Sequence, residues 1–185
     1  MTKTEAYIRD AIKTWVWSGF HDEAAVNDML EDILEDGVDV EAMRRAISAE
    51  FEMKAEAEKS WPVETDCDRL DRAFMVLDAD GVCAVQNAGY TMSDGYTDVT
   101  EAVHDRGLEK YRGYCFYHGQ DLERAVRGEG LMIAFGDLDD DPAKGVVIGG
   151  AVCAALKQAG FTTEWDGTID QRINVPKLDW KRRYT

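Results

Sequence analysis

The chain has 185 residues, of which 45% are apolar and 31% charged, a composition typical of one globular domain or one domain with a helical extension. Its 37 acidic residues outnumber its 21 basic ones, which gives a formal net charge of -16. This charge argues against nucleic acid and anionic membranes as partners, because proteins bind both polyanions through basic residues. A basic protein partner or a cationic ligand is compatible with it, although acidic surfaces also serve solubility alone.

The cysteines indicate a reducing compartment. Cys67, Cys83, Cys115 and Cys153 are far apart and form no C-x-x-C pair or Cys/His cluster of the zinc type. Three of them lie in apolar runs, where a free cysteine behaves as a small hydrophobic residue. The N-terminus is charged and periodic, unlike a signal peptide, and the longest apolar run, 146–156, is too short to span a bilayer. We therefore expect a soluble, cytoplasmic protein.

The first 60 residues predict three helices, at about 4–18, 22–35 and 39–59, each with an apolar face. Gly19 and Gly37 are placed to end the first two helices, and Asp39 is placed to cap the third. Pro62 then interrupts the helical pattern, because proline disfavours helix at the residue before it. We place a boundary there, between a helical N-terminal segment, 1–60, and an α+β domain, 61–185, and expect the two to form one compact unit.

After this boundary, helical patterns alternate with short apolar runs that are typical of buried strands. We expect helices at about 66–78, 97–106, 121–127 and 142–159, and strands at 82–85, 114–117, 131–135, 161–165 and 172–175. Gly149 and Gly150 weaken an otherwise apolar helix, which close packing there would explain. The predicted fold class is α+β, with an N-terminal helical layer followed by a four- to five-stranded mixed sheet with packed helices.

Two acidic stretches, 78–81 and 137–141, resemble the beginning of a calcium-binding loop. Such a loop needs a bidentate glutamate at its twelfth position, where this chain has Gly89 and Ile148. The glycines of 145–150 match neither the dinucleotide spacing nor the P-loop. We therefore predict no metal and no cofactor.

Polar side chains follow two of the predicted strands. The ligand-binding candidates are Asn87, Tyr90, Ser93 and Asp94 after the first strand, and His118, Gln120 and Asp121 after the second. His118 could act as a general base or a proton-switched binder, with Asp121 either orienting it or simply capping the next helix. If the two strands are parallel, their loops converge at one edge of the sheet. We then expect His118 to share a pocket with Tyr90, Ser93 or Asp94.

Two functions remain open at this point. The leading hypothesis is a non-enzymatic acidic binding or regulatory module, because the chain carries a large negative charge and no complete catalytic motif. The alternative is a small-molecule enzyme or sensor that uses the 87–94 loop and His118. The sequence assigns no catalytic residue and leaves the oligomeric state undecided.

Three segments together carry a family resemblance. They are NAGYTMSDG, YCFYHGQDLERAVRGEGLMIAFG and the closing arrangement of W-D-G, R-I and W-K-R-R. From about Trp15 to the C-terminus, the chain resembles an uncharacterised bacterial domain family of unknown function. The resemblance implies a bacterial, cytosolic origin and carries over no activity, cofactor or catalytic residue.

Overall fold

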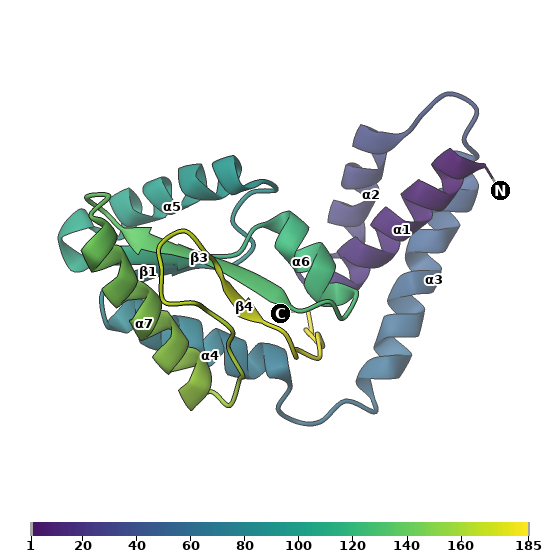
Figure 1. Ribbon diagram of the computed structural model, residues 1–185. Helices are drawn as coiled ribbons and strands as arrows, with labels where there is room; N and C mark the ends of the chain where they lie inside the picture. Colours follow the sequence, from purple (N-terminus) through teal and green to yellow (C-terminus); the bar gives the residue numbers. More distant parts are fainter. Residues whose placement is uncertain (1, 185) are drawn as a thin grey trace. The chain divides into compact units, whose positions relative to one another are not determined.

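The computed structural model describes residues 2–184, which fold as an α+β protein with seven α-helices, one short 3-10 helix and four β-strands (Figure 1). The chain divides into two compact units. The first contains Met1–Thr65 and Trp180–Thr185, and the second contains Asp66–Asp179. Within residues 2–184, no helix combines the length and the apolar character needed to cross a membrane.

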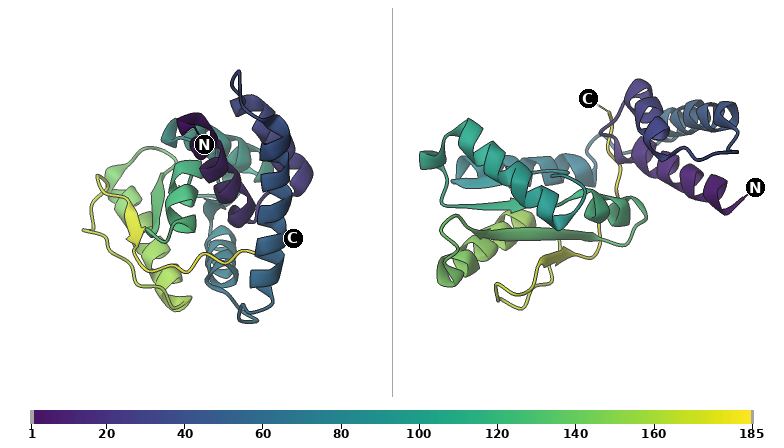
Figure 2. Two further views of the ribbon diagram at one scale, coloured as in Figure 1. Left: turned by 90° about the vertical axis from the view of Figure 1, so that its right-hand side faces the viewer. Right: turned by 90° about the horizontal axis from the view of Figure 1, so that it is seen from above.

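Three helices form the first unit: α1 (Lys3–Ser18), α2 (Glu23–Ile33) and α3 (Val40–Glu58) (Figure 2). Its core consists of seven buried apolar side chains, Ile8, Ile12, Val16, Val26, Leu30, Met43 and Ile47. Gly19, at φ 78°, ends α1, and Asp39 caps α3 by accepting a hydrogen bond from the N–H of Ala42 (2.9 Å). α2 ends before the expected Gly37, because Leu34 is already extended.

The C-terminal tail belongs to this helical unit. The indole N–H of Trp180 donates a hydrogen bond to the carbonyl oxygen of Ser18 (3.0 Å). The guanidinium of Arg182 lies 4.6 Å from the ring centre of Phe20, a cation–π contact. These contacts explain why the basic and aromatic end of the chain, 180–184, groups with the first 65 residues.

The second unit is built on one mixed sheet. Its strands are β1 (Val82–Val85), β2 (Gly113–Phe116), β3 (Leu131–Asp137) and β4 (Ile173–Val175), in the spatial order β1-β2-β3-β4. β1 and β2 are parallel, whereas β2–β3 and β3–β4 are antiparallel. The carboxyl end of β3 therefore lies at the opposite end of the sheet from the carboxyl ends of β1 and β2.

Helices cover both faces of this sheet (Figure 1). They are α4 (Asp66–Ala79), α5 (Met92–Arg106), α6 (Gly119–Val126) and α7 (Pro142–Gln158). α5 lies on one face, where Phe116 packs with Val99 and Val103. α4 and α7 lie on the other face. The alternation at the end of β2 fits this arrangement, since Phe116 faces α5 while Tyr117, the next residue, contacts Phe74 of α4.

The core of the second unit includes side chains of the sheet and of α7. Phe116 and Ile133 are fully buried and Phe135 nearly so, and Ile148, Val152 and Leu156 form the buried face of α7. The two glycines of α7 differ, however. A Cβ on Gly149 would lie 2.7 Å from both Phe135 and Trp165, so close packing requires glycine there. A Cβ on Gly150 would meet nothing within 4 Å.

Three details of the expected fold are wrong. The sheet has four strands, because the segment expected as a strand at 161–165 contributes only a single bridge, between Glu164 and Asn174. α5 begins at Met92, five residues earlier than expected, since Thr91 and Asp94 form a capping box. α6 begins at Gly119 with His118 as its N-cap, so Asp121 is the third residue of the helix rather than its cap.

Candidate functional site

The segments that follow β1 and β2 lie side by side, as the parallel pairing of these strands requires. The N–H of Gly119 donates to the carbonyl of Gly89 (2.9 Å), and the N–H of Gln120 donates to the carbonyl of Tyr90 (3.2 Å). The hydroxyl of Tyr90 also donates to Oε1 of Glu123 (3.1 Å). The two polar segments are therefore joined by backbone hydrogen bonds.

His118 lies inside this junction, with its side chain only 5% exposed. Its Nδ1 accepts the N–H of Asp121 (3.4 Å), and its Nε2 lies 3.1 Å from Oδ2 of the same residue. Nε2 also lies 3.3 Å from Nη1 of Arg172, so both groups meet at this nitrogen. Burial lowers the pKa of His118. Asp121 opposes this by raising the pKa, and Arg172 lowers it further.

Arg172 completes a buried polar cluster, which we call the α6 cluster: His118, Asp121 and Arg172. Nη1 of Arg172 donates to both carboxylate oxygens of Asp121, at 3.0 and 2.9 Å. The Asp121 side chain is 2% exposed, whereas Arg172 is 33% exposed. Because Arg172 directly precedes β4, the cluster ties the start of α6 to the last strand. Nδ1 of His118 is thus bonded to Asp121, and Nε2 lies close to both Asp121 and Arg172.

The remaining sequence candidates have local roles. Asn87 is half-buried and adopts a left-handed backbone, at φ 50°. Asp94 is exposed in the first turn of α5, where hydrogen bonds from Thr91 lower the pKa of its carboxyl. Tyr90, Ser93 and Gln120 are exposed. Of these, Tyr90 and Gln120 meet at the start of α6, where His118 and Asp121 are buried.

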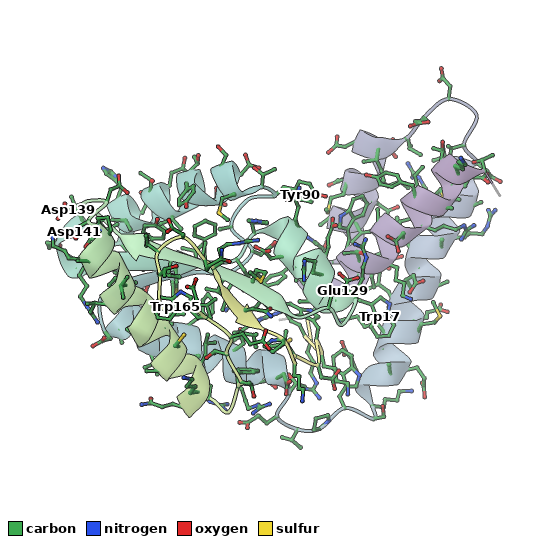
Figure 3. The ribbon with its side chains drawn as sticks, viewed as in Figure 1. Trp17, Tyr90, Glu129, Asp139, Asp141 and Trp165 are labelled. Atoms are coloured by element: carbon green, nitrogen blue, oxygen red, sulfur yellow. The ribbon has the colours of Figure 1, made fainter. Side chains whose placement is uncertain are left out.

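A hollow lies at the other end of the sheet. It is a pocket of about 590 Å³ between α5, β2 and the loop after β3. Four aliphatic side chains, Val99, Val103, Leu108 and Leu138, give it an apolar wall. In Figure 3, Asp139 and Asp141 mark this end of the unit and Tyr90 marks the opposite end.

Two tyrosines and two aspartates form the polar end of this pocket: Tyr96, Tyr114, Asp137 and Asp140. The same four residues line an adjacent hollow of about 200 Å³ that reaches Pro142 and Ile169. We call these four residues the Tyr–Asp end. They come from three elements, namely α5, β2 and the region where β3 passes into the following loop.

Glycine permits the tyrosines to take these positions. Tyr114 pairs with Gly136 in the antiparallel register, and a Cβ on Gly136 would lie 2.7 Å from Cζ of the Tyr114 ring. Gly95 is buried directly against Phe116, which lets α5 approach the sheet. Tyr96 then packs edge-to-face on Tyr114, with ring centres 5.9 Å apart.

The Tyr–Asp end is electronegative. Oδ2 of Asp137, a residue only 6% exposed, accepts backbone N–H groups from Asp139 (2.9 Å) and Asp141 (3.3 Å). Within residues 2–184, no donor is bonded to its Oδ1. Burial raises the pKa of Tyr114, and Tyr96, Asp140 and Asp137 raise it further. Ionisation of the Tyr114 hydroxyl is thus disfavoured, because its anion would lie beside the carboxylates of Asp137 and Asp140.

Sequence reasoning missed these four residues as a site. The stretch 137–141 drew attention only as an incomplete calcium loop, and Tyr114 only as part of a buried strand. One signal was present: Tyr114 occupies the strand face opposite to Cys115, so its polar hydroxyl has to emerge on the α5 side. The position of α5, which forms the pocket's other wall, is a tertiary property.

Comparison with known proteins identifies a family but no activity. A family model described as a domain of unknown function, DUF6891, matches residues 1–184. No curated protein and no solved structure is similar enough to match. The match covers nearly the whole chain and confirms the expected membership of a family of unknown function, extending it to the first helix. The chain belongs to the DUF6891 domain family.

Proposed function

We propose that Asp66–Asp179 is a small-molecule-binding domain and that the pocket between α5 and the β2–β3 pair is its ligand site. The observation that carries this proposal is the pocket itself. Its volume of about 590 Å³ falls within the range of roughly 300–1,000 Å³ that is usual for ligand pockets. An apolar wall with a few polar groups gathered at one end is also the usual composition of such sites.

The geometry around His118 favours binding over histidine-based catalysis. A general base has to reach the proton that it removes, whereas this ring is buried, with Nδ1 bonded to Asp121 and Nε2 close to Asp121 and Arg172. The alternative, an enzyme or sensor at the 87–94 loop, draws support from the backbone hydrogen bonds that place this loop beside His118. It would require the α6 cluster to open. The exposed pocket requires no such change, so a binding or regulatory role is the simpler proposal.

The test is a ligand screen of the full-length protein by ¹H–¹⁵N correlation spectroscopy, with small compounds that cover cationic, neutral and anionic classes. Binding in the pocket should shift the amide signals of Tyr96, Val99 and Tyr114. Thr100→Trp should abolish these shifts, because Thr100 lines the pocket on the exposed side of α5 and an indole would occupy it.

Thr97→Trp is the matched control for this variant. Thr97 is also an exposed threonine of α5, but it lies outside the pocket lining, so its replacement should leave binding intact. If no compound of any class shifts the pocket amides, the proposal is wrong. It is equally wrong if the Thr100→Trp variant binds as well as the Thr97→Trp variant.

We further infer a cytoplasmic location. All four cysteines are free, and all four are buried. Buried thiols that form no disulfide are usual in proteins of a reducing compartment. This supports the location that the cysteine pattern indicates, and fractionation of the source cells would test it: recovery outside the cytosolic fraction would contradict the inference.

A further inference from the structure

The charged groups around the pocket are mostly acidic. The last residue of β3 and the loop after it contribute four carboxylates, from Asp137, Asp139, Asp140 and Asp141. One nearby ammonium, that of Lys144, bonds to Asp139 (3.2 Å). Among the described residues that line the pocket there is no lysine and no arginine. His104 is the lining residue that can gain a positive charge, and its side chain is 88% exposed. A ligand at the Tyr–Asp end therefore meets negative charge.

The aromatic rings of the Tyr–Asp end also favour a positively charged ligand. Tyr96 is 46% exposed at the mouth of the pocket and packs at a right angle to Tyr114. The face of a tyrosine ring carries negative electrostatic potential and attracts ammonium and guanidinium groups. The free acceptor on Asp137 and the exposed carboxylate of Asp140 are also partners for a charged N–H donor. An anionic ligand would be repelled by each of these groups.

The apolar wall determines what the rest of the ligand is. Val99 and Val103 lie one helical turn apart on α5 and extend away from Tyr96 along the pocket, with Leu108 beyond them. A small inorganic cation would leave this surface in contact with water. An aryl or alkyl group attached to the cation would cover it.

From these observations we infer that the ligand is an organic amine whose ammonium group sits at the Tyr–Asp end and whose apolar body lies along the α5 wall. This inference rests on the ligand-binding function proposed above and specifies the chemical class of the ligand. It agrees with the chain's net charge of -16, which raises the local concentration of cations around the protein.

Three probes of nearly equal size test the charge preference on the full-length protein: 2-phenylethylamine, 2-phenylethanol and 3-phenylpropionate. Dissociation constants come from the amide shifts of Tyr96 and Tyr114 at neutral pH. The amine should bind at least about ten times more tightly than the alcohol, because a charge-assisted hydrogen bond in a partly buried site is worth this much. The carboxylate should bind more weakly than both.

Two variants of the loop after β3 distinguish a direct contact between the ammonium group and Asp140 from the general negative potential of the loop. Asp140→Asn should weaken binding of the amine about tenfold or more and leave binding of the alcohol unchanged. The fold should tolerate it, because Asp140 has φ 57°, a conformation that asparagine adopts readily. Asp139→Asn removes the same charge from a residue outside the pocket lining and should change the amine's affinity by less than about twofold.

A third variant tests the ring. Tyr96→Leu should weaken binding of the amine, whereas Tyr96→Phe, which keeps the aromatic face, should restore it. The inference is overturned if the alcohol binds as tightly as the amine, or if Asp139→Asn and Asp140→Asn have the same effect. If the alcohol binds tightly in the pocket, the proposed ligand-binding function stands, but the inference that the ligand carries a positive charge is wrong. If none of the three probes binds, the amine assignment fails, and the broader screen decides the binding function independently.

Discussion

Removing the carboxylate of Asp121 should destabilise the second unit far more than removing an exposed acidic residue. Asp121 is almost completely buried and accepts hydrogen bonds from Arg172 on both oxygens. Breaking a buried ion pair by removing one partner costs about 3–5 kcal/mol, because the other charge is left without compensation. Arg172 is 33% exposed, so water can partly solvate its guanidinium after the change. We therefore expect Asp121→Ala to cost about 3 kcal/mol, the lower end of that range.

The assay is urea denaturation with a probe for each unit. Trp165 is the only tryptophan between residues 66 and 179, and its indole N–H is bonded to the carbonyls of Thr168 and Gln171, next to Arg172. Its indole NMR signal therefore reports on the second unit. With slopes of about 1–3 kcal/mol per molar urea, a loss of about 3 kcal/mol lowers the midpoint by about 1–3 M. The indole signal of Trp17, which is bonded to Glu50, follows the first unit.

Asp80→Ala is the matched control in the same unit. Asp80 also pairs with an arginine, Arg112, but both side chains are about half-exposed, and such surface pairs contribute at most about 1 kcal/mol. A double-mutant cycle with Arg172→Met should show that the two changes in the α6 cluster are less costly together than their sum. Equal midpoints for Asp121→Ala and Asp80→Ala would refute the reasoning.

Three further predictions concern the same unit and use the Trp165 probe. Burial lowers the pKa of His118 below its unfolded value of about 6.5, so the unfolded state takes up the proton first and the stability of the unit should fall as the pH drops below about 6.5. His118→Asn keeps a side-chain acceptor for the helix cap and should make the midpoint less sensitive to pH between about 7.5 and 5; an unchanged slope would exclude His118 as its source. Gly149→Ala should destabilise by about 1–3 kcal/mol because its Cβ would overlap an aromatic contact, whereas the neighbouring Gly150→Ala should stabilise by up to about 1 kcal/mol; effects of the same sign would contradict the packing of α7. Ile133→Ala should cost about 2–5 kcal/mol, as expected for a fully buried aliphatic residue, and a midpoint equal to that of the unaltered chain would count against its place in the core.

Local patterns in the sequence predict most of the helices and strands, because apolar periodicity and capping residues largely determine where these elements form. The predicted strand at 82–85 matches β1 residue for residue, and Asp39 caps α3 as expected. The run 161–165 has the composition of a strand but is largely irregular. Trp165 packs edge-to-face on Phe135, with ring centres 5.3 Å apart, and lies beside α7 in Figure 3. Burial of an aromatic residue needs no β-ladder, so composition alone misleads there.

The contacts of His118 show what local patterns leave out. Arg172 lies 54 residues further along the chain, and nothing in the local sequence links it to His118. Histidine is also outside the usual set of N-cap residues, so the local sequence favours Asp121 as the cap, whereas His118 occupies that position. Parallel pairing of β1 and β2 was a condition of the site hypothesis, and it holds. Residues 118–121 alone therefore do not predict that His118 and Asp121 are buried in an ion-paired cluster with Arg172.

The direction of the strands explains why the open pocket lies away from the residues that the sequence singled out. Loops converge at the carboxyl ends of parallel strands, and in this sheet only β1 and β2 are parallel. At that end, the α6 cluster fills the space beneath the loops with its own ion pair. β3 runs the other way and brings Asp137 to the opposite end, where α5 stands over Tyr114. In a mixed sheet each end receives carboxyl termini of strands, so polar residues after an antiparallel strand also have to be considered as candidates for a ligand site.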